Sequence, residues 1–318
     1  MKQTQFINAR KADWQLLERE IEGSDKNTDF IDLPALLRAV THDLAISKSR
    51  SYSPDLVNKL NTLVTSAQAK MYQPKHKVWY ELLRFMRVGF PLSVFQLKRA
   101  VIINHFLFYG LALVAYLLTI YKPELIYQFV DNFQVSNIES MYNPESKYRL
   151  KERASSGDFA MFGFYIFNNI KLAFQTFVGG LVLGVGALFF LIFNGFFFGA
   201  ISAHIVNIGY QSTFFSFVIT HGSFELTAIV LSAAAGTHIG YSLLNPGRLS
   251  RSIAVKQAAK RAFPVMFGAF IFLIIAAFIE AFWSSSLWLP NSVKYTVGAC
   301  CWIFIAIYFY RGHKHAAR

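Results

Sequence analysis

Two side chains that could do chemistry, His221 and Glu225, lie four residues apart in the stretch VITHGSFELTAIVLSAAAG, which is otherwise apolar or small. On a helix this spacing places both on one face, together with the small residues Ala228, Ser232 and Ala235. An imidazole and a carboxylate in this arrangement can hold a metal ion, handle a proton or substrate, or form a buried hydrogen bond. The last, structural interpretation is the simplest of the three.

A metal site would need more ligands than this pair. Zinc proteases use His-Glu-x-x-His, whereas His238 falls roughly opposite Glu225 at about 100° per residue, so a third ligand would have to come from His204 on another segment. Cys300 and Cys301 are adjacent in an apolar run, where neighbouring helical side chains diverge. We therefore predict no metal, no cofactor and no enzyme, with a metal-dependent enzyme as an alternative.

Further polar residues interrupt the apolar stretches, and such residues usually face a protein interior. They are Asn168, Asn169, Lys171, Asn194, His204, Asn207, His238 and Glu280. Glu280 lies four positions before Ser284, near the end of its run, which predicts an interfacial position. We predict a polar core of Asn168, Asn169, Asn194, His221 and Glu225, in which Asn194 hydrogen-bonds the His–Glu pair.

The composition indicates the environment of these residues. Of 318 residues, 54% are hydrophobic and only 15% are charged, against about 25% charged in soluble proteins. The chain is therefore predicted to be an all-α, polytopic membrane protein. Its first apolar run follows about a hundred polar residues, so we expect no cleavable signal peptide.

Apolar runs close to the ~20 residues that cross a bilayer predict the membrane spans. Five long runs are Val101–Tyr121, Leu172–Phe193, Phe214–Leu243, Phe263–Trp283 and Val293–Tyr310, and a shorter sixth is Gly195–Ile208. About six transmembrane helices follow from these runs.

The net charge of +13 is distributed unevenly along the chain. Residues 1–99 carry 16 Lys and Arg against 10 Asp and Glu, residues 245–262 carry 5 against 0, and loop 122–158 carries 5 against 6. Cytoplasmic loops collect Lys and Arg, so both termini and 245–262 are predicted inside and 122–158 outside. No nucleic-acid-binding motif accompanies the charge, so we expect a lipid bilayer and no nucleic acid as partner.

Glycines predict where helices approach closely in the membrane. Gly180 and Gly184, and Gly195 and Gly199, form two Gly-xxx-Gly pairs that match the small-residue stripe ending at Gly236. A break is expected at Asn194–Gly195, and Gly222 beside His221 marks a second candidate interruption.

The polar N-terminal region predicts a small cytosolic helical bundle. Trp14, Leu17 and Ile21 indicate a first helix, and apolar residues at helical spacing indicate two more within 33–44 and 56–71. Residues 75–99 mix aromatic and basic residues, which is typical of an amphipathic helix in the membrane interface, ended by Pro91. The predicted organisation is therefore 1–74, 75–99 and a transmembrane domain at 100–318.

Several stretches together resemble the stage II sporulation protein M family. They are NNIKLAFQTFVGGLVLGVGALFFLIFNGFFFGA, HGSFELTAIVLSAAAG and GYSLLNPG, and the N-terminal FINARKADWQLLE resembles the long form found in non-sporulating bacteria. The resemblance implies a bacterial inner-membrane protein that serves as a scaffold for peptidoglycan-remodelling proteins. It also implies other envelope proteins and a cytosolic MoxR-type ATPase system as partners, and the sequence is compatible with a homo-oligomer.

The predicted function is therefore an integral inner-membrane scaffold or adaptor in cell-envelope maintenance. The first alternative is a small-molecule or lipid transporter that uses the polar core. A scaffold requires a filled core, whereas a transporter requires an opening that reaches Glu225.

Overall fold

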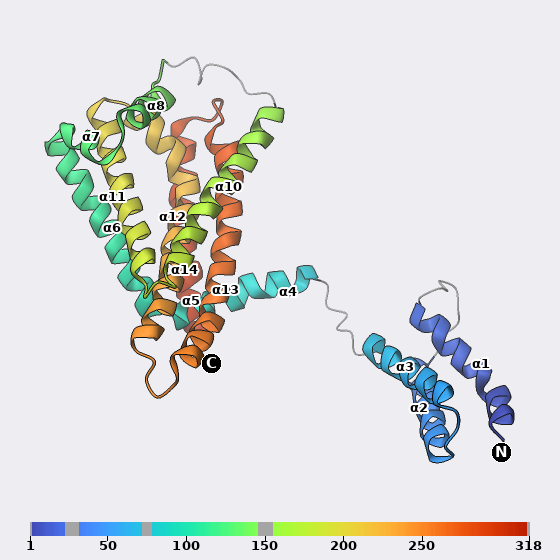
Figure 1. The fold of residues 1–318 in the computed structure, drawn as a ribbon. Helices are drawn as coiled ribbons and strands as arrows, with labels where there is room; N and C mark the ends of the chain where they lie inside the picture. Colours follow the sequence, from blue (N-terminus) through green and yellow to red (C-terminus); the bar gives the residue numbers. More distant parts are fainter. Residues whose placement is uncertain (1, 23–31, 72–77, 146–154, 317–318) are drawn as a thin grey trace. The chain divides into compact units, whose positions relative to one another are not determined.

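The computed structural model describes residues 2–22, 32–71, 78–145 and 155–316. The chain forms two compact units, Met1–Val78 and Trp79–Arg318 (Figure 1). Every long element in them is a helix, which confirms the predicted all-α, polytopic class.

The N-terminal unit contains three amphipathic helices, α1 (Gln3–Glu22), α2 (Leu33–Ser49) and α3 (Pro54–Met71). Asp32 caps α2 by accepting a hydrogen bond from the Ala35 amide. Apolar side chains from all three helices form a core of their own. The core residues are Phe6, Trp14, Leu17, Leu37, Val40, Leu44, Leu56, Leu60, Leu63, Val64 and Ala67.

The segment predicted as one interfacial helix consists of three parts, and its residues 75–77 lie outside the described chain. Helix α4 (Val78–Arg84) buries none of its side chains, whereas α5 (Phe90–Gln96) packs into the membrane unit with Phe90 fully buried. Pro91 does not end a helix, contrary to the prediction. It lies in the first turn of α5, where its missing N–H is tolerated, directly after a π-helical segment, Phe85–Gly89.

Six long helices form the membrane unit (Figure 1). They are α6 (Lys98–Tyr121), α10 (Ser155–Gly179), α11 (Val185–Asn207), α12 (Gln211–Leu244), α13 (Arg251–Phe278) and α14 (Asn291–Ala316). Five of them are long and apolar enough to cross a membrane, and α13 with its π-helical continuation counts as one. The more polar α10 packs against α11, α12 and α13 as the sixth. Helix α12 contacts all five others and forms the centre of the bundle.

The second predicted span, Leu172–Phe193, is wrong in its bounds because it belongs to two helices. The chain turns at Gly180–Gly184, where Gly184 adopts the left-handed conformation with φ +83° that glycine tolerates best. Helix α11 then runs unbroken through Asn194 and Gly195, so the break expected there is absent. Hydropathy does not detect this turn because its residues are as apolar as the helices it joins.

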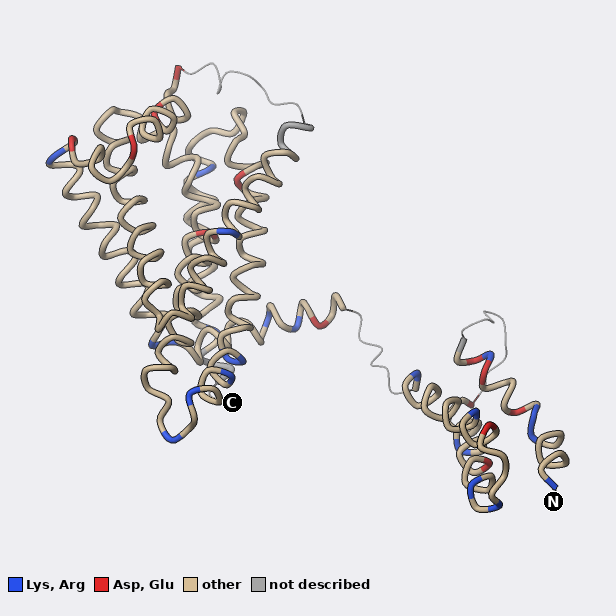
Figure 2. Tube along the Cα trace, viewed as in Figure 1, with Lys and Arg blue, Asp and Glu red and all other residues tan. Residues whose placement is uncertain are grey.

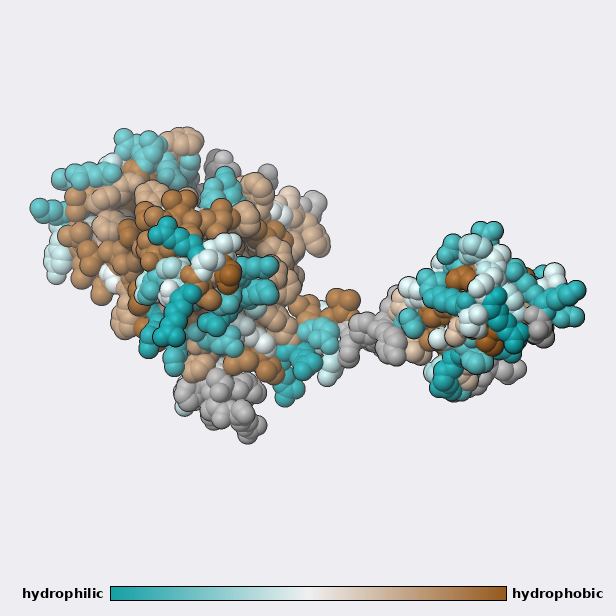
Figure 3. Space-filling view, turned by 60° about the horizontal axis from the view of Figure 1, so that its bottom comes forward, coloured by the Kyte–Doolittle hydropathy of each residue, from teal (hydrophilic) through white to brown (hydrophobic). Residues whose placement is uncertain are grey.

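The bundle has two chemically different ends. Residues 245–250 form a turn, and the basic residues 251–262, expected as a loop, are the first turns of α13. Figure 2 shows Lys and Arg gathered at this end, near the C-terminus, while the other end carries both signs. In Figure 3 this end presents hydrophilic residues bordered by apolar sides, as expected of a bundle in lipid.

The opposite end is covered by part of the segment predicted as an outer loop. A 3₁₀ turn (Pro123–Leu125), α7 (Ile126–Phe129) and α8 (Asn132–Tyr142) lie across it. Ile126, Val130 and Val135 pack there against Ile201, Ile205 and neighbouring residues. Residues 146–154 of the predicted loop lie outside the described chain.

Candidate functional site

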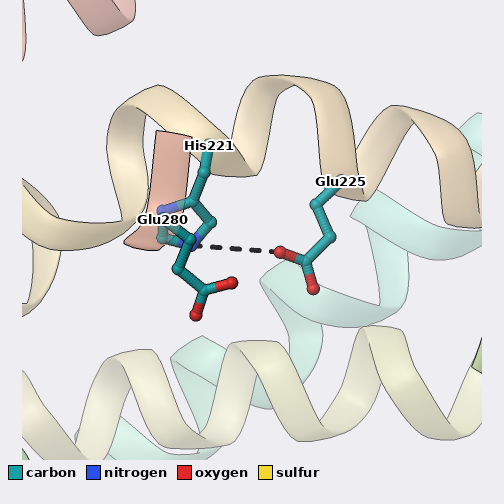
Figure 4. Close-up of side chains that lie close together, drawn as sticks. All are labelled: His221, Glu225 and Glu280. Atoms are coloured by element: carbon teal, nitrogen blue, oxygen red, sulfur yellow. Dashed lines mark ion pairs between the residues drawn. The ribbon is translucent and has the colours of Figure 1, made fainter. Parts of the chain in front are cut away.

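Three ionisable side chains meet inside the membrane bundle: His221, Glu225 and Glu280. One ligand-type atom from each lies within 4.8 Å of the other two. His221 and Glu225 are one turn apart on α12, and Glu280 comes from the π-helical end of α13 (Figure 4). Glu280, predicted to lie in the membrane interface apart from the pair, thus joins His221 and Glu225, and the predicted pairing of His221 with Glu225 on one helix face is seen.

The imidazole of His221 is buried, with 5% of the residue exposed. Its Nδ1 lies 3.0 Å from the Ser284 hydroxyl, and the Phe217 backbone lies beside the ring one turn earlier. The Phe217 ring packs edge-on against the imidazole, with the ring centroids 5.2 Å apart. These contacts fix the ring, so that Nε2 points to the Glu225 carboxylate, 3.9 Å away. That distance is too long for a hydrogen bond.

The two carboxylates are only partly buried. Glu225 exposes 21% of its side chain, and Glu280 has intermediate exposure. Asn169 of α10 is 5% exposed, and its amide lies within reach of the Glu280 carboxylate. The site is thus built by three helices.

The π-helical segment Ile279–Ser284 explains how Glu280 reaches the site. A π-turn holds one more residue than an α-turn, so it rotates the side chains that follow relative to α13. Lys294 of α14 contacts the end of this segment: its Nζ donates hydrogen bonds to the carbonyl oxygens of Ser284 and Ser286 at 2.8 and 2.7 Å. Such segments often occur at functional sites.

The three asparagines of the predicted polar core lie in different surroundings. Asn169 is in the site, but its neighbour Asn168 is exposed on the other face of α10. Asn194 donates to the Phe190 carbonyl oxygen of its own helix at 2.7 Å and does not bond the His–Glu pair. Both departures follow from helix geometry: adjacent residues cannot share a face, and an unbroken α11 satisfies Asn194 locally.

The other candidate ligands lie elsewhere. His204 of α11 contacts Glu139 of α8 through Nε2 at 2.7 Å, so the third ligand that the sequence suggested is not at this site. Asn207 donates to the Thr119 carbonyl oxygen. His238 lies outside the three-residue cluster, and Cys300 and Cys301 are free thiols.

Five of the six predicted packing glycines contact the backbone of a neighbouring helix or turn. A methyl group on Gly180 would overlap Gly236 of α12. The turn residue Gly184 lies directly against Gly240 of α12, which the prediction had not included. Gly195 and Gly199 pack as closely, but against Phe108 and Ala112 of α6, so the prediction that they face α12 is wrong.

Gly222 does not act as predicted. The neighbours of an added methyl group there would be Val218 and Leu226 of its own helix, and α12 continues through it without interruption.

Two family models match the chain. A family model described as stage II sporulation protein M matches residues 103–285, which include His221, Glu225 and Glu280. A second model, described as a domain of unknown function (DUF8413), matches residues 4–73.

An uncharacterized protein of Methanocaldococcus jannaschii is 29% identical over 117 residues, which are 36% of this chain and 66% of that protein. The match thus spans just under two thirds of the relative. No solved structure matches the chain.

Proposed function

We propose that this chain, which belongs to the stage II sporulation protein M family, is a membrane scaffold of the bacterial cell envelope. In this role it holds peptidoglycan-remodelling proteins at the inner membrane and catalyses no reaction itself. The family membership supports a membrane protein, and the architecture supports the scaffold role.

The observation that carries the proposal is the tight packing around α12. A methyl group on Gly180, Gly236 or Gly240 would overlap the facing backbone, and this close contact brings the α10–α11 turn directly onto α12. Small-residue contacts of this kind let helices approach closely in lipid, where interior packing replaces the hydrophobic effect. A bundle closed in this way suits a fixed platform better than helices that must separate to move a substrate.

Parts outside the bundle offer surfaces for partners. The N-terminal unit has its own core and a mainly hydrophilic surface (Figure 3). Helices α7 and α8 cover the end opposite the basic one, and Phe133 of α8 is 75% exposed. In the proposed orientation the N-terminal unit faces the cytosol, where a MoxR-type ATPase could dock, and α8 faces the peptidoglycan.

Photo-crosslinking in native membranes tests this function. A photoreactive residue would replace Leu16 in the N-terminal unit, Phe133 in α8, or Phe106 in α6 as the control. Phe133 and Phe106 are equally exposed, at 75% and 76%, but Phe106 lies on a predicted membrane span. We expect Phe133 to capture a peptidoglycan-degrading protein, Leu16 a cytosolic protein, and Phe106 neither. The same products at all three positions would contradict the scaffold function.

A second candidate function, transport of a small ion or molecule, is favoured by one observation. Glu225 exposes 21% of its side chain, so the polar site is not sealed from the surface of the bundle. A transporter would move its substrate when reconstituted alone into liposomes, and Glu225→Gln would abolish that movement. A scaffold requires no such flux.

A further inference from the structure

We propose that His221, Glu225 and Glu280 bind a first-row divalent metal ion, such as Zn²⁺ or Mn²⁺, between α12 and the end of α13. The sequence offered only His204 as a third ligand for His221 and Glu225, because Glu280 was predicted to be interfacial. This inference goes beyond the scaffold role, since partner binding and metal binding can succeed or fail separately.

The donor set fits this class of ion. Imidazole and carboxylate are the ligands that zinc, manganese and iron share, with bonds of about 2.0–2.2 Å. In Figure 4 the imidazole and both carboxyl groups face one common space. Their ligand atoms lie within 4.8 Å of one another, so small side-chain rotations would bring all three to bonding distance.

The charges of the site require a cation or protons. Lys171, Glu225, Glu280 and Lys294 are the only charged residues between 159 and 310 outside the basic stretch 245–262. Among the described residues no Lys or Arg forms an ion pair with either glutamate. Lys294 donates hydrogen bonds to backbone carbonyl oxygens, and Lys171 is exposed. Two carboxylates side by side in a low-dielectric interior repel each other strongly, and a divalent ion would neutralise both.

The histidine is oriented as a metal ligand would be. The Ser284 hydroxyl lies 3.0 Å from Nδ1 and can accept a hydrogen bond from it, which corresponds to the tautomer with the imidazole proton on Nδ1. Nε2 then carries no proton and presents its lone pair to a Glu225 carboxylate oxygen, so that two hydrogen-bond acceptors face each other. Metal-bound histidines typically use this arrangement, in which a carbonyl or hydroxyl holds one nitrogen and the ion occupies the other.

Asn169 adds a polar group from a third helix to the site. Its side chain is buried beside Glu280, and its amide lies within reach of that carboxylate. Exchanging the amide oxygen and nitrogen, which their similar shape permits, would turn a carbonyl oxygen to the site. Glu225 exposes 21% of its side chain, so one carboxylate of the site reaches the surface of the bundle.

The test uses the full-length protein, purified in detergent without added metal and analysed for metal content. Wild type, Glu280→Gln, Glu225→Gln and His221→Gln would be compared after exposure to equimolar Zn²⁺ or Mn²⁺ and gel filtration. Glu139→Gln is the matched control because it alters a different His–Glu contact. We expect about one ion per chain in wild type and Glu139→Gln, and at least a tenfold lower content in the three site variants.

A second measurement covers variants that fail to fold. Wild-type protein would be treated with EDTA, melted, and melted again after Co²⁺ is added, with the visible absorption of cobalt recorded. Metal should raise the melting temperature and produce the cobalt bands. Folded wild type that retains no more metal than Glu280→Gln, or that melts identically with and without metal, would overturn the proposal and assign the site to carboxyl groups that share protons.

Discussion

At the scale of single residues, Glu280 has two opposite roles that depend on what lies between it and Glu225. Without a cation, Glu280→Gln removes repulsion between neighbouring carboxylates and should stabilise the protein. With a bound ion, the same change removes a ligand and should destabilise it. We expect each effect to be on the order of 1–3 kcal/mol. The melting temperatures of wild type and Glu280→Gln, each measured with EDTA and with Zn²⁺, give the direction of the stability change in each condition. For Glu139→Gln this direction should be the same in both.

Among the described acidic residues of the N-terminal unit, the Asp43 carboxylate accepts the most side-chain hydrogen bonds. It is 2% exposed and accepts hydrogen bonds from Arg10 Nε at 3.0–3.1 Å and from Trp14 Nε1 at 2.9 Å. Asp43→Ala should destabilise this unit by about 1–3 kcal/mol, because it leaves the buried indole N–H unsatisfied while Arg10 keeps its contact with Asp13.

Hydrogen exchange of α1–α3 peptides in the full-length protein would measure this loss. Asp55 is exposed in the first turn of α3, so Asp55→Ala serves as the control. It should cost less than about 1 kcal/mol. Equal exchange in both variants would show that the Asp43 network does not stabilise the unit.

The His–Glu pair and the missed third residue show what sequence can reveal at this scale. The i, i+4 spacing on a helix with a small-residue stripe is a local pattern, and it places His221 and Glu225 together correctly. Glu280 depends on the depth at which α12 and α13 run side by side, and on a π-helical turn that rotates its side chain. His221 lies ten residues inside α12, about 15 Å along its axis from the start of the helix.

At the scale of elements, the contact of α12 with the α10–α11 turn predicts a large effect from a single methyl group. Gly240→Ala would push into the backbone of Gly184, and relief would require moving a turn or a helix. We expect a loss of about 1–3 kcal/mol or more, as for other overpacked interiors.

The matched change is Gly110→Ala in α6, where a methyl group would meet nothing within 4 Å. Alanine favours a helix over glycine, so this variant should be neutral or more stable by up to about 1 kcal/mol. Thermal unfolding of both variants in the same detergent provides the comparison. Similar melting temperatures would mean that the turn is not held against α12.

Helices were easier to predict than the turns between them. Long apolar runs located α6, α12 and α14 closely, and the apolar part of α13, because burial in lipid demands continuous apolar sequence. The turn at Gly180–Gly184 was missed because it is apolar itself, with Leu181, Val182 and Leu183 exposed on its surface. The helical start of α13 was missed for the opposite reason, since basic residues resemble a loop whether or not they are helical.

At the scale of the whole molecule, the unequal charges of the two bundle ends predict the orientation in the membrane. In a background with Cys300→Ser and Cys301→Ser, a single cysteine would replace Asn132 in α8 or Lys256 in α13, both exposed. A membrane-impermeant maleimide applied to intact spheroplasts should label position 132 at least tenfold more than position 256. Permeabilised cells should label both, which controls for reactivity. Preferential labelling of position 256 in intact spheroplasts would reverse the orientation.

The polarity of α10 also bears on how the protein is made. Alone among the six long bundle helices, α10 falls short of the apolarity of a membrane span, and its buried Asn169 has Glu280 beside it only once α13 exists. A translocon that releases segments singly into lipid would therefore retain α10 in its aqueous interior. The tight Gly180–Gly184 turn joins it to the far more apolar α11, so the two should leave the translocon as one hairpin. Final docking then waits for the synthesis of α12 and α13, which makes assembly of this bundle late and dependent on the C-terminal third of the chain.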